Sequence, residues 1–319
     1  MDQPAPVRGR FAPTPSGEMH VGNAFSALIA WLSARSQGGQ MVLRMEDLDP
    51  ARTSPAFARQ IEEELAWLGL DWDEGSEKGG PFGPYAQSAR GAFYAAALQT
   101  LEEMGLLYPC FCSRGERHAA AAPHDADGRY VYSGRCRNLS PQQRRERQKT
   151  KSPALRVRLP AEEVVFCDRL YNWQRFFLPR DWGDIILRRA DGVFAYHLAV
   201  TADDGAMQIT EVVRGRDLLA SAACQTALFR LLGYEPPAFA HIPLILSPEG
   251  RRLSKRDGDL SLSALRTRLK TPERLIGALA LACGLLDRPE PLTARELLPL
   301  FSWDRMQKED MILPREWLM

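Results

Sequence analysis

A short segment near the start of the chain carries residue types suited to binding phosphate. Residues 15–23 read Pro-Ser-Gly-Glu-Met-His-Val-Gly-Asn, after an apolar run and before apolar residues at helical spacing. We therefore predict a strand-to-helix turn here. In such a turn Gly17 and Gly22 let the backbone approach a ligand closely, and the helix N-terminus directs free amides toward it. His20 adds a hydrogen-bond donor at the same place, and Asn23 is of a type favoured as a helix N-cap.

A second segment, late in the chain, supplies a cation. Residues 252–256 read Arg-Leu-Ser-Lys-Arg and contain the compact ammonium group of Lys255. Taken alone, either segment could be an ordinary turn or a solvated basic loop. Together and in this order they resemble the His-x-Gly-His and Lys-Met-Ser-Lys-Ser signatures of the class I aminoacyl-tRNA synthetases, with Asn23 in place of the last His. The resemblance implies catalytic roles for His20 and Lys255, and ATP binding by Gly17, His20, Gly22, Asn23, Ser254 and Lys255.

Four further motifs resemble those of glutamyl-tRNA synthetases: Arg-Phe-Ala-Pro-Thr-Pro-Ser-Gly at 10–17, Arg-Met-Glu-Asp-Leu-Asp at 44–49, Tyr-His-Leu-Ala at 196–199 and Arg-Gly-Arg-Asp-Leu at 214–218. A glutamate site needs cations for two carboxylates and an acceptor for an ammonium group. Arginine suits the carboxylates because its planar fork binds both oxygens at once. The resemblance implies that Arg10 and Arg214 hold carboxylate and Glu46 holds the ammonium group, in a pocket completed by Phe11, Ala12, Pro13, Thr14 and Tyr196.

Each of these residues also has a structural reading. Glu46 and Arg44 could form an ion pair that only stabilises the fold, and Tyr196 could be an ordinary hairpin aromatic. As a set in the family's order, they favour the pocket. The chemistry that the resemblance implies is attack of L-glutamate on ATP, accompanied by Mg²⁺, to give an adenylate, followed by transfer of the glutamyl group to an acceptor.

Three of the six cysteines stand close enough in sequence to suggest a metal site. Cys110 and Cys112 form a Cys-x-Cys pair, and Cys136 follows in Tyr-Ser-Gly-Arg-Cys over residues 132–136. Zinc prefers four ligands and binds thiolates well. On spacing alone, buried free thiols are an equally good interpretation. Six scattered cysteines in a chain of this length do not form the pattern of a disulfide framework.

The resemblance makes the metal site more specific. Shortened relatives of glutamyl-tRNA synthetases bind zinc through two cysteines, a tyrosine and a cysteine in this arrangement, which implies one zinc ion per chain on Cys110, Cys112, Tyr132 and Cys136. The insert between Cys112 and Tyr132 carries His118 and His124. Either histidine could replace Tyr132, so the fourth ligand stays open.

The elements that must position these residues form an α/β pattern. Strands are expected at 7–12 and 41–45, joined by a helix over 24–35 that Gly38 and Gly39 close. A second strand-helix-strand pattern follows, with a strand at 207–213, a helix at 218–232 and a strand at 241–246. We therefore predict a doubly wound, Rossmann-like parallel sheet, in which ligands bind beyond the carboxyl ends of the strands.

Between these two patterns the periodicity breaks. We expect a first half of the catalytic domain at 1–107, a zinc-containing insertion at 108–181 resembling an acceptor-binding domain, the second half at 182–258, and a helical C-terminal segment at 259–319. Within the second half, Ile185–Arg189 and Val193–Val200 flank Asp-Gly, which predicts a β-hairpin.

Composition agrees with a globular enzyme. With 319 residues, 45% hydrophobic and 25% charged, the chain can bury a core and exceeds a typical single domain. A net charge of +1 argues against strong nonspecific nucleic-acid binding but permits local basic patches, such as the one over residues 144–151, which is a solvated helix surface or a phosphate contact. No apolar run approaches the roughly 20 residues that span a bilayer, and residues 1–10 lack a signal-peptide pattern. We expect a cytoplasmic monomer with no membrane partner.

A full glutamyl-tRNA synthetase continues into an anticodon-binding domain, which we do not expect in this chain. Together with the cysteine segment, this makes the chain similar to the glutamyl-queuosine tRNA(Asp) synthetases, which transfer glutamate to the queuosine base in the anticodon loop of tRNA(Asp). Two alternatives remain: a truncated glutamyl-tRNA synthetase that charges a tRNA 3′ end, and an inactive synthetase-like binding protein. The second has no chemical need for His20, Glu46 and Lys255 together.

Overall fold

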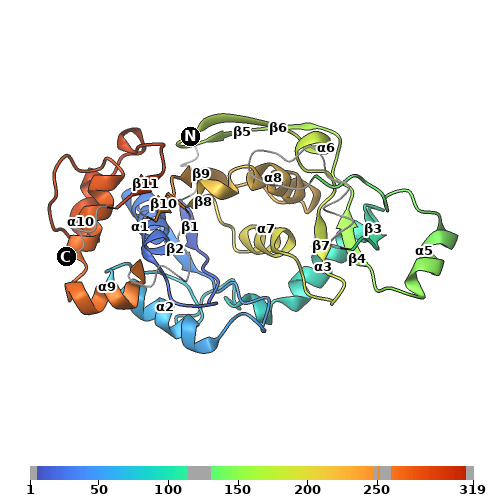
Figure 1. Cartoon of the computed structure of the whole chain (residues 1–319), viewed down its shortest axis with the longest axis horizontal. Helices are drawn as coiled ribbons and strands as arrows, with labels where there is room; N and C mark the ends of the chain where they lie inside the picture. Colours follow the sequence, from blue (N-terminus) through green and yellow to red (C-terminus); the bar gives the residue numbers. More distant parts are fainter. Residues whose placement is uncertain (1–5, 114–130, 248–249, 252–259, 314–319) are drawn as a thin grey trace.

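The computed structural model describes residues 6–113, 131–247, 250–251 and 260–313 (Figure 1). Four residues of the predicted sites, Ser254, Lys255, His118 and His124, lie outside these ranges. The part that is described has a parallel sheet near its centre, the helices α9 (Leu262–Leu269) and α10 (Glu273–Ala282) at one end, and the helix α5 (Pro141–Gln148) at the other (Figure 1). In these ranges no helix is both long and apolar enough to cross a bilayer.

The first predicted strand-helix-strand unit is present. Strand β1 (Arg8–Phe11) pairs in parallel with β2 (Gln40–Leu43), and α1 (Val21–Ser36) connects them. Helix α1 is buried over most of its circumference because the sheet lies on one side and the C-terminal elements on the other. Gly38, with φ of +65°, follows the end of the helix as the sequence predicts.

The second unit forms another parallel strand pair beside the first. Strand β8 (Glu211–Gly215) pairs in parallel with β9 (Ala238–Ile242), and α8 (Ser221–Leu231) connects them. Strand β8 also lies beside β1, since the backbone N–H of Thr210 donates to the carbonyl of Arg8 at 3.0 Å. The two parallel pairs, β1-β2 and β8-β9, therefore lie side by side with β1 next to β8, and the carboxyl ends of β1 and β8 face the same cavity.

The remaining elements surround this sheet. Helices α2 (Pro55–Trp67) and α3 (Gly91–Glu103) precede the region of the cysteines, where β3 (Leu107–Cys110), β4 (Ala154–Val157) and β7 (Ile186–Arg188) form an antiparallel sheet. That sheet thus includes a strand from beyond residue 181. A hairpin and several short elements complete the described fold: β5 (Glu163–Asp168), β6 (Asn172–Phe177), α6 (Leu178–Asp181), β10 (Ile245–Leu246), α11 (Ala294–Leu297), β11 (Met311–Ile312), and 3₁₀ turns at Gln87–Ala89, Arg216–Leu218, Leu298–Leu300 and Trp303–Arg305.

The hairpin predicted around Asp-Gly is only half correct. The turn forms, because Gly192 N–H donates to the Arg189 carbonyl at 3.0 Å and Arg188 bridges Phe194. The strand predicted over Val193–Val200 is wrong beyond that point, since the helix α7 (Tyr196–Ala206) begins at Tyr196. Leu198, Ala199 and Ala202 recur at helical spacing and pack in the same buried cluster as residues of α3 and α8, so tertiary packing decides the conformation.

Candidate active site and cysteine cluster

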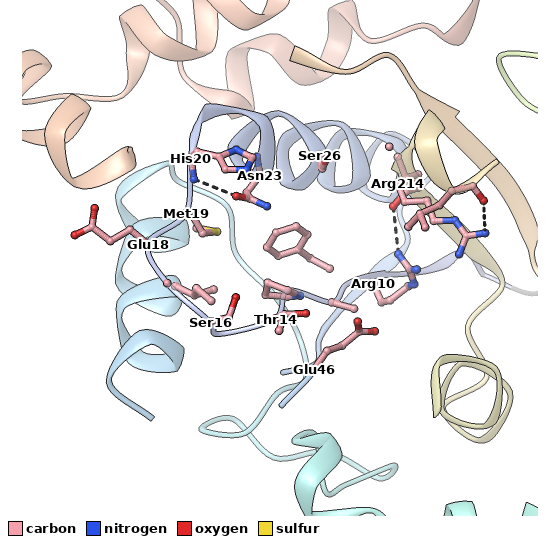
Figure 2. Close-up of a pocket in the computed structure, with 18 of the residues that line it drawn as sticks. Arg10, Thr14, Ser16, Glu18, Met19, His20, Asn23, Ser26, Glu46 and Arg214 are labelled. Atoms are coloured by element: carbon pink, nitrogen blue, oxygen red, sulfur yellow. Dashed lines mark hydrogen bonds between the residues drawn. The ribbon is translucent and has the colours of Figure 1, made fainter. Parts of the chain in front are cut away.

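A cavity of about 630 Å³ opens at the carboxyl ends of β1 and β8 (Figure 2). Its walls come from the loop after β1, the first turns of α1, the segment after β2, the start of α7 and the end of β8. Most residues of the predicted glutamate and ATP sites meet there: Arg10, Phe11, Ala12, Pro13, Thr14, Gly17, His20, Asn23, Glu46, Tyr196 and Arg214. Gly22 is not among the lining residues.

Two arginines stand on neighbouring strands at one side of this cavity (Figure 2). Arg10 on β1 is buried, and its Nη1 donates to the Val213 carbonyl at 3.2 Å. Its Nε lies 3.6 Å from Asp204 Oδ1. Burial lowers the pKa of Arg10, although Asp204 opposes that shift, so desolvation is the dominant influence on this cation. A cation that has lost water and is only partly paired is suited to bind a ligand carboxylate.

Arg214 on β8 is the second cation, and it is held more tightly. Its Nε donates to His241 Nε2 at 3.0 Å, its Nη1 to Gln225 Oε1 at 2.8 Å and its Nη2 to the Leu218 carbonyl at 3.3 Å. An arginine has five N–H donors. Two therefore remain for a bound ligand within the part of the chain that the structure describes.

Glu46 fits both interpretations that the sequence allows. It lines the cavity, and its Oε1 also lies 3.4 Å from Nη2 of the fully buried Arg44. Arg44 makes a closer contact with Asp204, at 2.6 Å. Burial raises the pKa of Glu46, and the nearby Arg44 and Arg10 reduce that effect. A partly buried carboxylate that shares its arginine with other acids can accept a cationic group from a ligand.

Tyr196 completes this side of the cavity as the first residue of α7, not as a hairpin aromatic. Burial raises its pKa, so it stays a neutral hydroxyl near the two arginines. The loop after β1 is fixed against Glu46, whose backbone N–H donates to the Pro13 carbonyl at 2.9 Å. Thr14 and its neighbours therefore keep a defined position relative to the carboxylate.

His20 and Asn23 lie at the other side of the cavity, and they form a helix cap (Figure 2). His20 is the N-cap of α1: its Nδ1 accepts the backbone N–H groups of Gly22 at 3.1 Å and Asn23 at 3.3 Å. Asn23 Oδ1 accepts the His20 N–H at 3.0 Å in return. The prediction that these first-turn amides are free was therefore wrong, and Asn23 occupies the third helical position instead of the N-cap. Because Nδ1 accepts, a neutral His20 carries its proton on Nε2, which can donate.

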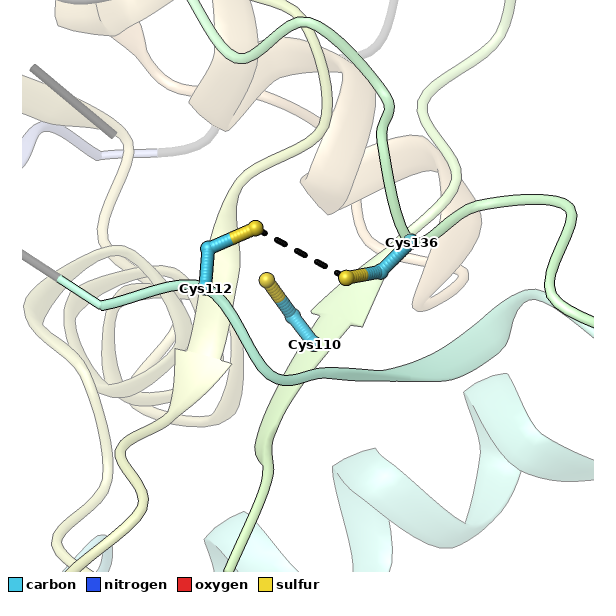
Figure 3. Close-up of side chains that lie close together, drawn as sticks. All are labelled: Cys110, Cys112 and Cys136. Atoms are coloured by element: carbon cyan, nitrogen blue, oxygen red, sulfur yellow. Dashed lines mark hydrogen bonds between the residues drawn. The ribbon is translucent and has the colours of Figure 1, made fainter. Parts of the chain in front are cut away.

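The three cysteines converge as the sequence suggests (Figure 3). The sulfur atoms of Cys110, Cys112 and Cys136 all lie within 4.8 Å of one another, and the Cys112 and Cys136 sulfurs are 3.6 Å apart. Two thiolates on a tetrahedral zinc, each about 2.3 Å from the metal, are roughly 3.8 Å apart. The spacing therefore fits a metal with little movement, while all three cysteines are free in the structure.

Tyr132 takes the place predicted for a fourth ligand. Its hydroxyl oxygen lies 3.5 Å from Cys110 Sγ and 3.9 Å from Cys112 Sγ, near the roughly 3.5 Å expected between an oxygen and a sulfur ligand of one zinc. The same oxygen accepts the Cys136 N–H at 2.8 Å. The Arg156 guanidinium lies 3.6 Å from the centre of the Tyr132 ring and fixes its plane.

The thiols of this cluster differ in acidity. Burial opposes ionisation of Cys110, but the hydroxyl of Tyr132 and other donors outweigh it and lower the pKa of that thiol. Burial and the neighbouring Cys110 raise the pKa of Cys112 to about 11. Clustered thiols cannot all ionise at neutral pH without a cation among them, so metal binding here would release protons.

Sequence reasoning missed the groups that support the cavity from behind. Asp203 and Asp204 on α7 hold Arg44, and Asp203 also binds Arg90 at 2.5 Å. The pair of adjacent acids at 203–204 is a visible sequence signal, but it lies beyond the predicted hairpin and matches no motif. Asp168 and His241 support Arg214 and are 73 residues apart, a distance at which the sequence gives no local signal.

Comparisons with known proteins identify the family of this chain. The family model for the catalytic domain of class I tRNA synthetases (E and Q) matches residues 6–311. A protein of Symbiobacterium thermophilum named glutamyl-Q tRNA(Asp) synthetase is 49% identical over 311 residues, which cover 97% of this chain and 96% of that protein. A protein of the same name from Nitratidesulfovibrio vulgaris is 44% identical, with 98% and 97% covered. The glutamate–tRNA ligase of Symbiobacterium thermophilum is 38% identical, with 98% of this chain and 66% of that protein covered.

A solved structure of a related enzyme has a similar fold. The crystal structure of a glutamate tRNA ligase from Elizabethkingia meningosepticum, in complex with its amino acid, superposes with a TM-score of 0.81 at 29% identity. The match covers 98% of this chain and 68% of that one.

Proposed function

The chain belongs to the class I tRNA synthetases (E and Q) and, within them, to the glutamyl-Q tRNA(Asp) synthetase family, and from this membership we propose that it joins L-glutamate to queuosine in tRNA(Asp) at the expense of ATP. It is a ligase of the class I synthetase kind. The observation that carries the glutamate part of the proposal is the cavity in which Arg10, Arg214 and Glu46 converge.

The amino acid would bind at the arginine side of the cavity. Arg10 and Arg214 are cations on adjacent strands, and each can hold one carboxylate group of glutamate through charge-assisted hydrogen bonds. Glu46 lies on the facing segment, where it can accept the ammonium group. Tyr196, a neutral hydroxyl above these charges, can donate to a carboxylate oxygen or accept from the ammonium group. This arrangement selects a substrate with two carboxylates at one fixed separation.

ATP would bind at the His20 side. An oxygen of the glutamate α-carboxylate attacks the α-phosphorus in line, pyrophosphate leaves, and glutamyl-adenylate remains. Mg²⁺ bound with ATP supplies charge neutralisation on the phosphates. The Nε2–H of His20 can donate to a phosphate oxygen, since its Nδ1 is committed to the helix cap. Lys255, outside the described residues, would hold the leaving pyrophosphate. A hydroxyl of the queuosine base then attacks the carbonyl carbon of the adenylate, and AMP leaves.

The cysteine cluster would hold one zinc ion with a structural role. Its donor set of Cys110, Cys112, Cys136 and Tyr132 has spacings that fit a tetrahedral ion. The cluster closes the loop between β3 and α5 at the end of the molecule away from α10 (Figure 1). A zinc ion there would stabilise the insertion.

Two assays test this function. ATP–pyrophosphate exchange without tRNA should require glutamate, and aspartate should support it poorly because it is one methylene shorter. Labelled glutamate should then pass to tRNA(Asp) that contains queuosine and not to tRNA(Asp) that lacks it. Transfer to tRNA(Glu) that disappears when its 3′ end is trimmed would establish the alternative, an enzyme that charges a tRNA 3′ end.

A further inference from the structure

A chain of three polar side chains runs behind the cavity through the interior. Arg214 on β8 stands opposite His241 on β9 in the parallel register, and its Nε is 3.0 Å from His241 Nε2. His241 Nδ1 lies 2.6 Å from Oδ2 of Asp168, the last residue of β5. The exposed fractions of Asp168 and His241 are 1% and 0%, and neither residue lines the cavity.

The protons along this chain are fixed by the chemistry of arginine. A guanidinium group only donates, so His241 Nε2 must accept from Arg214. The proton of a neutral His241 is then on Nδ1, where it is donated to Asp168. Burial lowers the pKa of His241 to about 4, and although Asp168 opposes this shift, the positive charge of Arg214 adds to it. The ring is therefore a neutral link between a carboxylate and a guanidinium group.

Asp168 is itself held rigidly. Its Oδ1 accepts the backbone N–H groups of Leu170 at 3.1 Å and Tyr171 at 2.9 Å, and its Oδ2 accepts that of His241 at 3.1 Å. These bonds leave the carboxylate one orientation, directed at His241 Nδ1. A buried carboxylate whose hydrogen bonds are all formed holds its partners in fixed positions.

Arg214 is the end of this chain that reaches the cavity. Gln225 and the Leu218 carbonyl hold its two Nη atoms, and Phe239 packs against the guanidinium at 5.3 Å. The bond from Nε to His241 fixes the remaining direction of the planar group. Without this bond the guanidinium would be held only through its two Nη atoms, so its plane could tilt while its charge stays in place.

We infer that His241 and Asp168 are positioning residues, which set the orientation of the Arg214 fork so that its remaining N–H groups meet a glutamate carboxylate. The inference rests on the proposed function, because it takes glutamate as the ligand of Arg214. Neither residue touches the substrate. A preoriented arginine loses less conformational freedom on binding, and its two hydrogen bonds form together.

A pair of variants separates orientation from simple packing. In His241→Gln the amide oxygen can stand near the position of Nε2 and accept from Arg214, while the bond to Asp168 is lost. In His241→Asn the amide nitrogen can stand near Nδ1 and donate to Asp168, while the bond to Arg214 is lost. Both variants bury a primary amide, but Asn is one methylene smaller than Gln, so a purely structural role predicts a larger loss of stability in His241→Asn and a defect that falls on the KM for ATP as much as on the KM for glutamate.

We expect the KM for glutamate in ATP–pyrophosphate exchange to rise about tenfold to hundredfold in His241→Asn, and about threefold or less in His241→Gln. The KM for ATP should change by less than about twofold in either, because Arg214 contacts only the amino acid. Thermal unfolding checks that both variants are folded at the assay temperature. Glutamate binding by calorimetry gives the same comparison without turnover.

Two results would overturn this inference. Equal effects of the two variants on the KM for glutamate would make His241 a packing residue, and a fall in kcat at constant KM would place its influence elsewhere. If the unmodified protein shows no exchange with glutamate, the proposed function fails first, and the assignment of glutamate to Arg214 fails with it. That outcome is seen before any variant is made, so the two failures are distinct.

Discussion

Removal of one hydroxyl group, in Tyr132→Phe, tests whether the cysteine cluster is a zinc site with a tyrosine ligand. The hydroxyl oxygen is 3.5 Å from Cys110 Sγ and 3.9 Å from Cys112 Sγ, where a fourth ligand would be. Structural zinc sites contribute roughly 10–16 kcal/mol at neutral pH, or about 3 kcal/mol for each of four ligands. A water molecule can replace part of the contribution of the lost ligand. We therefore expect a loss of about 2–3 kcal/mol, or about thirtyfold to hundredfold weaker zinc binding.

The assay is a competition between the protein and a chromophoric chelator, with elemental analysis of the zinc content after purification. Tyr108→Phe is a matched control, because Tyr108 belongs to the same buried cluster and its hydroxyl donates to Asp184 at 2.6 Å. This control should lower the melting temperature, since it leaves the buried Asp184 short of a donor, but it should not change the affinity for zinc.

The reasoning would be refuted if Tyr132→Phe kept its affinity for zinc within about threefold of the unmodified protein, a change worth less than about 1 kcal/mol. Loss of zinc in His118→Ala or His124→Ala would then assign the fourth position to the insert. No zinc after purification without chelators, and no uptake of added zinc, would remove the metal site altogether.

Three further predictions follow from buried groups. Burial raises the pKa of Glu46, and only its carboxylate form pairs with an ammonium group, so the KM for glutamate should rise as pH falls through that raised pKa. Glu46→Gln should have a higher KM for glutamate at every pH and no such rise. If the KM of Glu46→Gln instead varied with pH in parallel with that of the unmodified protein, the assignment would be contradicted. Burial raises the pKa of Glu64 to about 7 from 4.5, so stability that is full below pH 4.5 is lost as pH rises toward 7. Glu64→Gln should therefore raise the melting temperature at pH 8, by an amount worth up to about 3 kcal/mol, with little change at pH 4.5, and an equal shift at both pH values would exclude this origin. A Cβ on Gly277 would lie 2.0 Å from the Glu290 carbonyl oxygen, so Gly277→Ala should lower the free energy of unfolding by about 1–3 kcal/mol in a urea titration, and an unchanged midpoint would show that the backbone yields there without strain.

Much of the catalytic half of the fold could be predicted from local patterns. Periodicity and capping chemistry explain strands β1 and β2, helix α1 and the cap of α2 by Ser54. Each of these signals involves residues that are only a few positions apart in the sequence. The failure at Tyr196 has a physical reason. Asp-Gly correctly predicts a turn, but it carries no information on how far the next strand runs, and packing against α3 and α8 makes the following residues helical.

The candidate site also contains residues that could be predicted from the sequence and residues that could not. Eleven of the residues that line the cavity were identified by resemblance, since their motifs are contiguous in sequence, whereas others such as Ser26 and Ile61 were not identified. The role of His20 as a helix cap was missed, because the sequence signature of a capping box is Ser or Thr followed three residues later by Glu or Gln, and here His20 and Asn23 make the same bonds. Asp168 and His241 could not be predicted, because they meet only when β5 lies beside β9, and no local signal reports such a contact.

The most direct test of the proposed function is where on the tRNA the glutamate is attached. Queuosine-containing tRNA(Asp) is prepared in two forms, one intact and one with its 3′-terminal nucleotide removed, and both are incubated with the protein, ATP, Mg²⁺ and labelled glutamate. The proposed function predicts equal labelling of the two forms, with the label recovered in the anticodon fragment after nuclease digestion. Labelling that disappears when the 3′ terminus is removed would contradict it.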